Sequence, residues 1–530
     1  MDEFDFVVVG AGSSGAPIVD RLTASGRHSV LLLEAGPDDD TNKWLSIPLG
    51  FTKTFLDPDV NWKFATEPEP ELNGRRIYWP CGKVVGGSSA INGAIYARGF
   101  PSDYDRWRQM GNPGWSFDDC LPYFKRLEAY PGGASDIHGG DGPVRITQHE
   151  YHNEIGEAFL AACAEAGLPL LPDFDGREGM GAYHATVSGG RRNSTGRAYL
   201  APARRRANCR VVTGALVERI EIADGRATGV AYRKDGQSVT ARARHEVVIS
   251  AGAVGSPRLL QLSGLGPAAV LGGLGIPVVR DLQGVGENLQ DHLGIRSTYR
   301  TWWRLTVNDD VRMPHRRLSA AVEYMLLRTG PLTANPAFVG AFVRLAPHSD
   351  EPDTQLHFLP WSSDRIDRGM HRFSGFTILA NQLRPESRGC VRITSPDPAA
   401  TPAIVANYLS TDLDRKLTVS AVKFVRLLAR TAALSQIITE ELQPGVEAWG
   451  DDDFLDHVRK EGQSSYNAVG TCRMGGDAGA VVDARLRVHG IAGLRVADAS
   501  IMPTLISGNT NAACMMIGER AADLILADAR

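Results

Sequence analysis

The first 34 residues constrain the fold more than any other part of the chain. Residues 4–9 are a short β-branched and aromatic run, typical of a buried parallel strand. They lead directly into residues 10–15, which have the spacing GxGxxG. A helical apolar pattern over residues 13–24 and a second strand-like run, residues 29–33, come next. This order predicts the opening βαβ unit of a doubly wound α/β fold.

The spacing inside this loop indicates a dinucleotide site. Gly10 permits the tight turn, Gly12 lets the backbone approach a pyrophosphate, and Gly15 allows the helix to pack closely on the strand. The phosphates would lie at the helix N-terminus, where free N–H groups and the helix dipole favour an anion. Glu34 closes the second strand, at the distance from the glycines where an acidic side chain binds a ribose. The unit therefore predicts a bound dinucleotide, without separating FAD from NAD.

Length and charge limit the class of protein. A chain of 530 residues is long enough for two packed lobes, because single cores stop growing near ~250–300 residues. The 57 basic and 61 acidic residues nearly balance, which describes a globular protein and argues against a nucleic-acid partner. The apolar runs are far shorter than the ~20 residues that cross a bilayer, so we expect no membrane span. Too few residues precede the first strand for a cleavable signal segment.

The cysteines and histidines argue against disulfides and metals. The seven cysteines are scattered, odd in number and never form CxxC, unlike a disulfide framework or a zinc knuckle. A reducing, cytoplasmic location is therefore expected. The thirteen histidines lack the HExxH spacing that places two ligands on one helical face. We expect no catalytic metal.

Further glycine-rich segments carry a family resemblance. Residues 82–94 contain Gly and Ser so densely that a large planar group could lie directly on the backbone. This segment resembles the first signature of the glucose-methanol-choline (GMC) oxidoreductase family, and residues 252–266 resemble its second. Further similar segments extend the resemblance over essentially the whole chain: residues 284–292, 469–475, 494–500, 502–504 and 509–511. The weakest resemblance lies over roughly residues 300–460, where a substrate lobe would belong.

The resemblance implies an FAD-dependent oxidoreductase, similar to choline dehydrogenases and aryl-alcohol oxidases. Such an enzyme moves a hydride from an alcohol carbon to flavin N5, and oxygen or another acceptor reoxidises the flavin. The cofactor-binding residues that the resemblance implies are Gly10, Gly12, Ser13, Ser14, Gly15, Glu34, Ala35, Val85, Gly87, Ser88, Asn92, Gly93, Ala94, Val217, Asp498, Ala499, Thr510 and Asn511.

The resemblance also bears on how the flavin is stabilised and how it is attached. Thr510 and Asn511 would lie near N1 and the C2 carbonyl of the isoalloxazine, where a donor or helix end stabilises the reduced flavin anion. Ile91 stands where some family members attach FAD through a histidine. We therefore expect non-covalent FAD.

The expected fold class is α/β, with a discontinuous Rossmann-like FAD-binding domain and a second α+β substrate-binding domain built on an antiparallel sheet. Residues 1–155, 190–297 and 465–530 are assigned to the first domain, and residues 156–189 and 298–464 to the second. The readable part of the second domain is aromatic, which suits either an apolar or aromatic alcohol beside the flavin or simply a packed core. These residues are Trp302, Trp303, Phe338, Phe342, Phe358 and Trp361.

The resemblance places the catalytic pair at Asn467 and Asn509, and Asn467 departs from the family. The family's base is typically a histidine three residues before the glycine of a Gly-Thr motif, here Gly470. A carboxamide has no useful basicity near neutral pH, whereas an imidazole titrates there. Asn509 fits, because asparagine is one of the family's usual choices there and its amide can donate to the substrate oxygen.

Three explanations of Asn467 stay open. The first is an engineered His→Asn substitution that holds a substrate without converting it. The second is a natural enzyme in which another group or water takes the proton, or in which a readily oxidised substrate needs little help. His357, on the strand-like residues 355–358, is a candidate for that group, although such a histidine is also common as a packing residue. The third explanation is a different reaction, such as that of a lyase or a light-driven decarboxylase. A flavin-binding protein that has lost catalysis is a further alternative.

Overall fold

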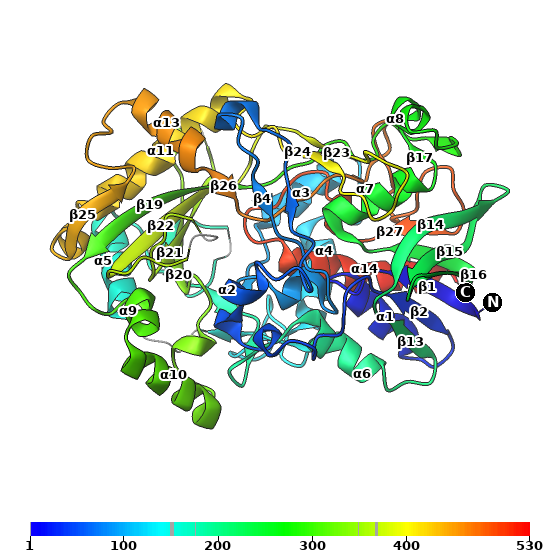
Figure 1. The fold of residues 1–530 in the computed structure, drawn as a ribbon, viewed down its shortest axis with the longest axis horizontal. Helices are drawn as coiled ribbons and strands as arrows, with labels where there is room; N and C mark the ends of the chain where they lie inside the picture. Colours follow the sequence, from blue (N-terminus) through cyan, green and yellow to red (C-terminus); the bar gives the residue numbers. More distant parts are fainter. Residues whose placement is uncertain (1, 149–152, 175, 348, 366–368, 530) are drawn as a thin grey trace.

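The computed structural model describes residues 2–148, 153–174, 176–347, 349–365 and 369–529. Met1 and Arg530, the ends of the predicted FAD-binding domain, lie outside these ranges. Two large sheets lie side by side along the length of the molecule, each with its own helices (Figure 1). Both chain ends lie at the side that holds the first sheet.

The first sheet is the expected parallel sheet with an antiparallel hairpin added at one edge. Its neighbours in order are β13 (Cys209–Val212), β2 (Val30–Leu33), β1 (Asp2–Val9), β16 (Gln237–Ile249), β15 (Arg226–Lys234) and β14 (Leu216–Ala223), while β27 (Leu494–Val496) pairs with β16. The pairs from β13 to β16, and β16 with β27, are parallel, whereas β15 runs antiparallel to both β14 and β16. The predicted strands at residues 4–9 and 29–33 are confirmed as β1 and β2.

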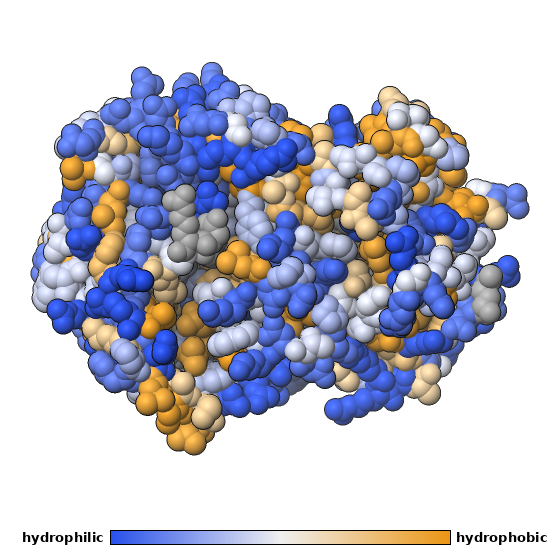
Figure 2. Space-filling model, in the orientation of Figure 1, coloured by the Kyte–Doolittle hydropathy of each residue, from blue (hydrophilic) through white to orange (hydrophobic). Residues whose placement is uncertain are grey.

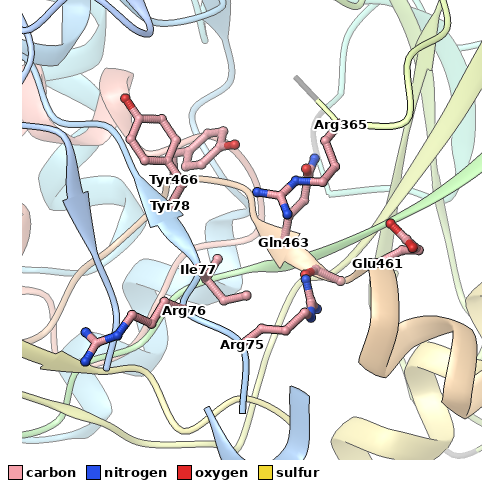
Figure 3. Close-up of a pocket in the computed structure, with 9 residues that line it drawn as sticks. Arg75, Arg76, Ile77, Tyr78, Arg365, Glu461, Gln463 and Tyr466 are labelled. Atoms are coloured by element: carbon pink, nitrogen blue, oxygen red, sulfur yellow. The ribbon is translucent and has the colours of Figure 1, made fainter. Parts of the chain in front are cut away.

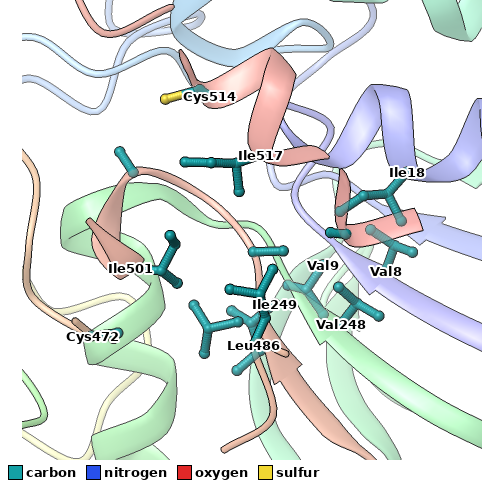
Figure 4. Packing of buried hydrophobic residues seen from close by; sticks show 14 of the residues in the cluster. Val8, Val9, Ile18, Val248, Ile249, Cys472, Leu486, Ile501, Cys514 and Ile517 are labelled. Carbon is teal, nitrogen blue, oxygen red and sulfur yellow. The ribbon is translucent and has the colours of Figure 1, made fainter. Parts of the chain in front are cut away.

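Two helices cover this sheet beside the glycine loop. The predicted helix at residues 13–24 is α1 (Gly15–Thr23), and α14 (Asn511–Asp528) packs against it. Aliphatic side chains of β1, β16 and both helices form the core between them (Figure 4). Full burial of one such side chain contributes about 1.5–3 kcal/mol. A Cβ on Gly518 would lie 2.4 Å from the Ser14 carbonyl oxygen, so glycine lets α14 touch the loop directly.

In the second sheet, neighbouring strands run antiparallel to each other. Its order is β25 (Ile438–Gln443), β19 (Leu293–Thr301), β22 (Gly375–Gln382), β21 (Thr354–Leu359), β20 (Val339–Val343) and β9 (Gly179–Ala182), while β26 (Gln463–Ser464) pairs with β19. Side chains from the sheet, α5 (Glu154–Glu165) and α11 (Asp412–Ala429) share one core. Leu356 and Phe358 of β21 belong to that core, so His357 between them points to the opposite face.

Helix α10 (Pro314–Leu327) follows α9 (Val307–Arg312) and carries apolar side chains on the surface. Figure 2 shows them as the hydrophobic region where Figure 1 places α10. Leu318 and Leu326 are 66% and 75% exposed. Their face of α10 therefore adds nothing to the core. Of the helices in the described ranges, none is both long and apolar enough to cross a membrane.

The remaining helices are distributed over both sheets. They are α2 (Phe51–Thr54), α3 (Pro101–Gln109), α4 (Phe117–Leu127), α6 (Ala201–Ala203), α7 (Gly252–Leu262), α8 (Ala268–Gly273), α12 (Ala432–Ser435) and α13 (Asp451–Glu461). Helix α13 packs against α11 and β19 of the second sheet, and α12 packs against α5. The small strand pairs are β3 (Phe64–Ala65) with β4 (Tyr78–Trp79), β6 (Glu128–Ala129) with β7 (Val144–Arg145), β11 (Val187–Ser188) with β12 (Arg191–Arg192), β17 (Leu265–Gly266) with β18 (Arg280–Asp281), and β23 (Cys390–Arg392) with β24 (Ala403–Val405). The strands β5 (Ile95–Tyr96), β10 (His184–Ala185) and β8 (Thr147–Gln148) form a third sheet. The predicted fold class is confirmed; the residue bounds of the two domains stay a prediction.

Candidate active site

The loop between β1 and α1 has the tight geometry that its glycines predict. Gly10 has φ +100°, and a Cβ there would lie 2.4 Å from the Ser250 carbonyl oxygen. A Cβ on Gly15 would lie 2.0 Å from the Gly10 carbonyl oxygen. A Cβ on Gly12, by contrast, would meet only the Cα of Gly87, at 3.9 Å. The protein therefore does not itself demand glycine at position 12, and the open space there suits a pyrophosphate that lies on the backbone.

Glu34 lies at the end of β2 with its carboxylate buried. Its oxygens accept hydrogen bonds from the N–H groups of Ala11 and Gly36, both at 2.9 Å. Burial raises the pKa of Glu34 to about 7. The N–H of Ala215 donates to the Glu34 carbonyl oxygen at 2.8 Å, and this contact brings the start of β14, with Val217, to the same edge. Glu34 thus fixes the glycine loop at the edge where a ribose is predicted to bind.

The second glycine-rich segment lies directly on the first loop. A Cβ on Gly87 would lie 2.7 Å from the Cα of Gly12, and one on Gly36 would lie 1.9 Å from the Lys83 carbonyl oxygen. Val85 is buried in the core of the first sheet. Two segments that are some seventy residues apart in sequence therefore form one continuous glycine-lined wall, as a large planar cofactor would require.

The end of this segment is a tight turn that faces the second sheet's side of the molecule. Asn92 Oδ1 accepts from the N–H of Ala94 at 2.9 Å, and Ala94 has φ +57°. A Cβ on Gly93 would lie 2.8 Å from Cγ of Pro336, which precedes β20. The predicted flavin contacts Asn92, Gly93 and Ala94 thus lie where the two halves of the molecule meet. The Ser88 hydroxyl is instead an acceptor for the Gly82 N–H, at 3.1 Å.

A third segment, which the sequence does not predict, joins the two glycine-rich loops. The hydroxyl of Thr195 donates to the carbonyl oxygens of Gly12 at 3.3 Å and Gly86 at 3.4 Å. Arg192 Nη1 donates to Asn92 Oδ1 at 2.7 Å and to the Ser89 carbonyl oxygen at 3.3 Å. One threonine and one arginine form no local pattern, so only the folded chain identifies them.

The N-terminus of α14 contacts the glycine loop. Ser13 Oγ donates to Asn511 Oδ1 at 2.7 Å, and Ser14 Oγ donates to the Cys514 carbonyl oxygen at 2.7 Å. Thr510 is the residue at the N-cap position. The positive end of an 18-residue helix therefore lies beside the predicted dinucleotide site, where it favours negative charge.

Asp498 fixes the edge of the sheet next to this site. Its buried carboxylate accepts from the N–H and hydroxyl of Ser500, the N–H of Gly252 and the hydroxyl of Ser256. Burial raises its pKa. The Ala499 carbonyl oxygen accepts from the Gly470 N–H at 3.2 Å. The side chain of Asp498 is thus fully used to join β27 to the start of α7, and Ala499 joins this edge to the segment that carries Asn467.

Asn467 is buried and held in one orientation. His292 Nε2 lies 3.0 Å from the Leu383 carbonyl oxygen, which can only accept, so Nε2 carries the proton. His292 Nδ1 therefore accepts from Asn467 Nδ2, 3.2 Å away. Asn467 Oδ1 in turn accepts from the N–H of Thr510 at 3.3 Å. The carboxamide is thus oriented by two long-range partners, and the predicted catalytic segment meets the predicted flavin contact Thr510.

Burial shifts the pKa values of the ionisable side chains around Asn467 in the direction that favours their neutral forms. Burial lowers the pKa of His292 to about 4, and burial together with His292 lowers the pKa of His357 to about 3. Burial raises the pKa of Asp291 to about 6; its oxygens accept from Tyr408, from Ser464 and from the backbone N–H of Asn467. Both histidines are therefore neutral at pH 7.

Asn509 and His357 each carry a buried polar atom that has no partner in the described chain. Asn509 Oδ1 and His357 Nδ1 are buried and accept or donate no hydrogen bond there. His357 lies on the sheet face opposite the core of Leu356 and Phe358, and its ring contacts that of Tyr183. Buried polar groups are nearly always hydrogen-bonded, so unpartnered ones point to a bound molecule or water. The predicted catalytic residue Asn509 has this property.

A surface pocket opens beside the catalytic segment (Figure 3). Tyr466, which precedes Asn467, lines it together with Arg75, Tyr78, Arg365 and others. Neither Asn467 nor Asn509 is among its lining residues. The pocket therefore adjoins the catalytic pair without containing it. Within the described ranges, no group of three or more His, Cys, Asp or Glu side chains is placed to hold a metal ion.

Most of the aromatic residues expected near the substrate are core residues. Phe338 and Phe358 pack in the core of the second sheet. Phe342 and Trp361 pack with Ile95 of the first half, in a smaller cluster. Trp302 is 61% exposed. The interpretation of these aromatic residues as packed core therefore accounts for Phe338, Phe342, Phe358 and Trp361.

Comparison with known proteins gives one answer over the whole chain. The family described as GMC oxidoreductase matches residues 4–294 and 385–518. An oxygen-dependent choline dehydrogenase of Vibrio vulnificus is 40% identical over 529 residues, which cover 99% of this chain and 94% of the relative. The structure of pyridoxine 4-oxidase from Mesorbium loti is similar with a TM-score of 0.88 and 29% identity, covering 98% of each chain. That of an Aspergillus oryzae formate oxidase, studied for FAD modification, gives 0.94 and 26%, covering 99% of this chain and 98% of the other.

The family matches cover both glycine-rich loops, most of β1 and the first part of α14, and the relative from Vibrio vulnificus is matched over nearly its full length. The chain therefore belongs to the GMC oxidoreductase family, the FAD-dependent enzymes that act on CH–OH donors.

Proposed function

We propose that this chain oxidises the CH–OH group of a small neutral alcohol, with Asn467 and Asn509 orienting the hydroxyl. The observation that carries the proposal is the buried Asn509 Oδ1, which has no partner among the described residues and lies one residue from Thr510, which binds Asn467. Bound FAD supplies the acceptor for the hydride that leaves the alcohol carbon. Oxygen or another acceptor then takes the electrons.

The chain's own residues orient the substrate and hold its proton. Asn467 offers hydrogen bonds from a carboxamide that His292 and Thr510 keep in place, but it has no basicity for the hydroxyl proton. His357 is our candidate acceptor for that proton, because its buried Nδ1 has no partner among the described residues; burial lowers its pKa and so makes it a weaker base than a free imidazole. The water-excluded setting strengthens each of these polar contacts.

The surroundings favour a neutral alcohol over a cationic one. The relatives include choline dehydrogenases, and choline carries a quaternary ammonium that aromatic faces or carboxylates bind. Here Arg296 already lies over the Trp361 ring, 5.1 Å from its centroid. Asp291, which contacts the catalytic segment, is used by Tyr408, Ser464 and a backbone N–H. We therefore propose an apolar or aromatic alcohol.

We further propose that FAD is bound without a covalent link. Ile91 is buried in a cluster with Leu45, Val60, Val84 and Ala90, and it has no atom that could bond to the flavin ring. Acid precipitation of the holoenzyme is expected to leave the flavin in solution.

All seven thiols are free, which supports our expectation of a reducing, cytoplasmic location.

Anaerobic titration with alcohols tests the proposed function. Primary, secondary and aromatic alcohols and choline are added to the holoenzyme without oxygen while the visible flavin absorbance is recorded. We expect an apolar or aromatic alcohol to bleach the flavin. Bleaching by choline alone would contradict the substrate proposal. No bleaching by any alcohol would contradict alcohol oxidation and favour a lyase or decarboxylase, or a protein that has lost catalysis.

The affinity for FAD is expected to weaken as the pH falls below 7. Glu34 has a pKa of about 7 without cofactor, and a ribose diol donates hydrogen bonds to the carboxylate form. Binding must then release a proton below pH 7, so the Kd is expected to rise by up to about tenfold per pH unit. Flavin fluorescence quenching between pH 5.5 and 8 measures the Kd. Glu34→Gln should bind more weakly and lose this slope; the same slope in both proteins would exclude Glu34 as its source.

A further inference from the structure

Arg192 is a fully buried cation whose recorded partners are all neutral. It follows β11 on β12 and is 1% exposed. Nη1 donates to Asn92 Oδ1 and the Ser89 carbonyl oxygen, and Nη2 donates to the Pro48 carbonyl oxygen at 3.2 Å. Its Nε is buried with no partner in the described chain. Such a charge is costly to bury, because neutral acceptors replace only part of its hydration.

The protein pairs another equally buried arginine in the usual way. Arg495 forms ion pairs with Glu246 and Asp528. Burial lowers the pKa of Arg192 to about 10, and no charged side chain in the described part of the chain opposes that effect. The guanidinium still remains charged at neutral pH. Arg192 therefore brings an uncompensated positive charge into the interior.

This charge is attached to the wall that is predicted to hold the flavin. Asn92 Oδ1 accepts from Arg192 and from the Ala94 N–H together, so the guanidinium fixes the turn over residues 92–94. Three residues further along, Thr195 binds the carbonyl oxygens of Gly12 and Gly86. Arg192 is thus built into the same wall through two residues of the segment 82–94, Ser89 and Asn92.

On the side of the site that holds Asn467, the predicted catalytic and flavin-contacting residues carry no positive charge of their own. Asn467, Asn509 and Thr510 are neutral, and burial keeps both His292 and His357 neutral at pH 7. The N-terminus of α14 supplies only a partial charge. A flavin that has gained a hydride carries a negative charge, which a fixed positive charge in a low-dielectric wall stabilises.

We propose that Arg192 is a positioning residue for the flavin: it holds the turn of Asn92 and supplies the positive charge that favours reduced over oxidised cofactor. The inference rests on FAD as the cofactor and not on which alcohol is oxidised. It assigns a function to a residue that contacts neither Asn467 nor Asn509 in the recorded hydrogen bonds.

The midpoint potential of the bound flavin tests the proposal. Arg192→Met is expected to weaken the preference for reduced flavin about tenfold, which for a two-electron couple lowers the potential by about 30 mV. Arg192→Lys keeps the charge and loses the two-pronged geometry. It should keep most of the potential while binding FAD more weakly. Spectroelectrochemical titration gives the potentials, and fluorescence quenching gives the affinities.

Arg426→Met is the matched control, because Arg426 is also buried, at 6% exposure, but contacts Glu441 of β25 and the carbonyl oxygens of Gly445 and Ala448. Its potential should equal that of the wild type. Unchanged potentials in both Arg192 variants would overturn the proposal, even with a lower Tm or weaker FAD binding. An equal shift in the Lys and Met variants would also overturn it.

Arg192→Gln is measured beside Arg192→Met, so that failure of the Met variant to fold leaves a charge-free protein to compare with the Lys variant. The Gln variant should show the lower potential. A wild-type protein that binds no FAD would contradict the cofactor itself, and this is visible before any variant is made. The two failures are therefore distinguishable.

Discussion

Asn467→His is expected to raise the rate of flavin reduction by alcohol ~10²–10⁴-fold, the usual contribution of a general base. Position 467 is buried and contacts Thr510, the residue that follows Asn509 in the sequence. An imidazole at this position is therefore expected to reach the same substrate oxygen that the carboxamide orients. Stopped-flow absorbance without oxygen measures the rate. The new rate should also fall as the pH drops through the pKa of the new imidazole, which burial beside His292 is expected to hold below the ordinary value of ~6.5.

Asn467→Gln is the control for this gain. It keeps a carboxamide without basicity, so it should be no faster than the wild type. If Asn467→His is also no faster, Asn467 does not occupy the place of a lost base. A wild type that is already fast, with His357→Asn slow, would instead support the explanation in which another group takes the proton.

Gly10→Ala is expected to destabilise the apoprotein by about 2–6 kcal/mol. Backbone strain at positive φ contributes about 1–3 kcal/mol, and overpacking contributes a similar amount. The added Cβ would lie 2.4 Å from the Ser250 carbonyl oxygen, between β1 and β16. Because the same turn opens the dinucleotide site, FAD content should fall with stability. Thermal unfolding and flavin absorbance of the purified variant measure both.

Gly26→Ala provides a matched control. Gly26 also has positive φ, +74°, but a Cβ there would meet no atom within 4 Å. Gly26→Ala should lower the free energy of unfolding only by the backbone strain, about 1–2 kcal/mol, and leave the FAD content unchanged. Equal losses in the two variants would show that the contact with Ser250 is unimportant.

The sequence predicts best where the information is local. The order of strand, GxGxxG loop, helix, strand and Glu34 lies within 34 residues, and β1, α1 and β2 follow it closely. Gly10 and Gly15 are required by contacts within or next to this unit, so their spacing alone was sufficient to predict the tight turn. The family motifs extend that prediction to the end of the chain, because each is also a short, continuous segment.

Three features were decided only by the tertiary structure. Thr195 reaches Gly12 across 183 residues, and Arg192 reaches Asn92 across 100, so no local pattern marks either contact. The orientation of Asn467 depends on His292 and Thr510, which come from different parts of the chain. The neutral histidines follow from burial, which exists only once both halves of the chain have packed together.

The sequence by itself therefore determined the cofactor fold and the family, because strand, loop and helix signals act over a few residues. The tertiary structure decided the charge and hydrogen bonding of the site, because a side chain's solvation and partners are set by residues that are distant in sequence. Understanding Asn467 requires both the sequence and the tertiary structure. The sequence identifies the residue, and only the folded chain shows which of its atoms face His292 and Thr510.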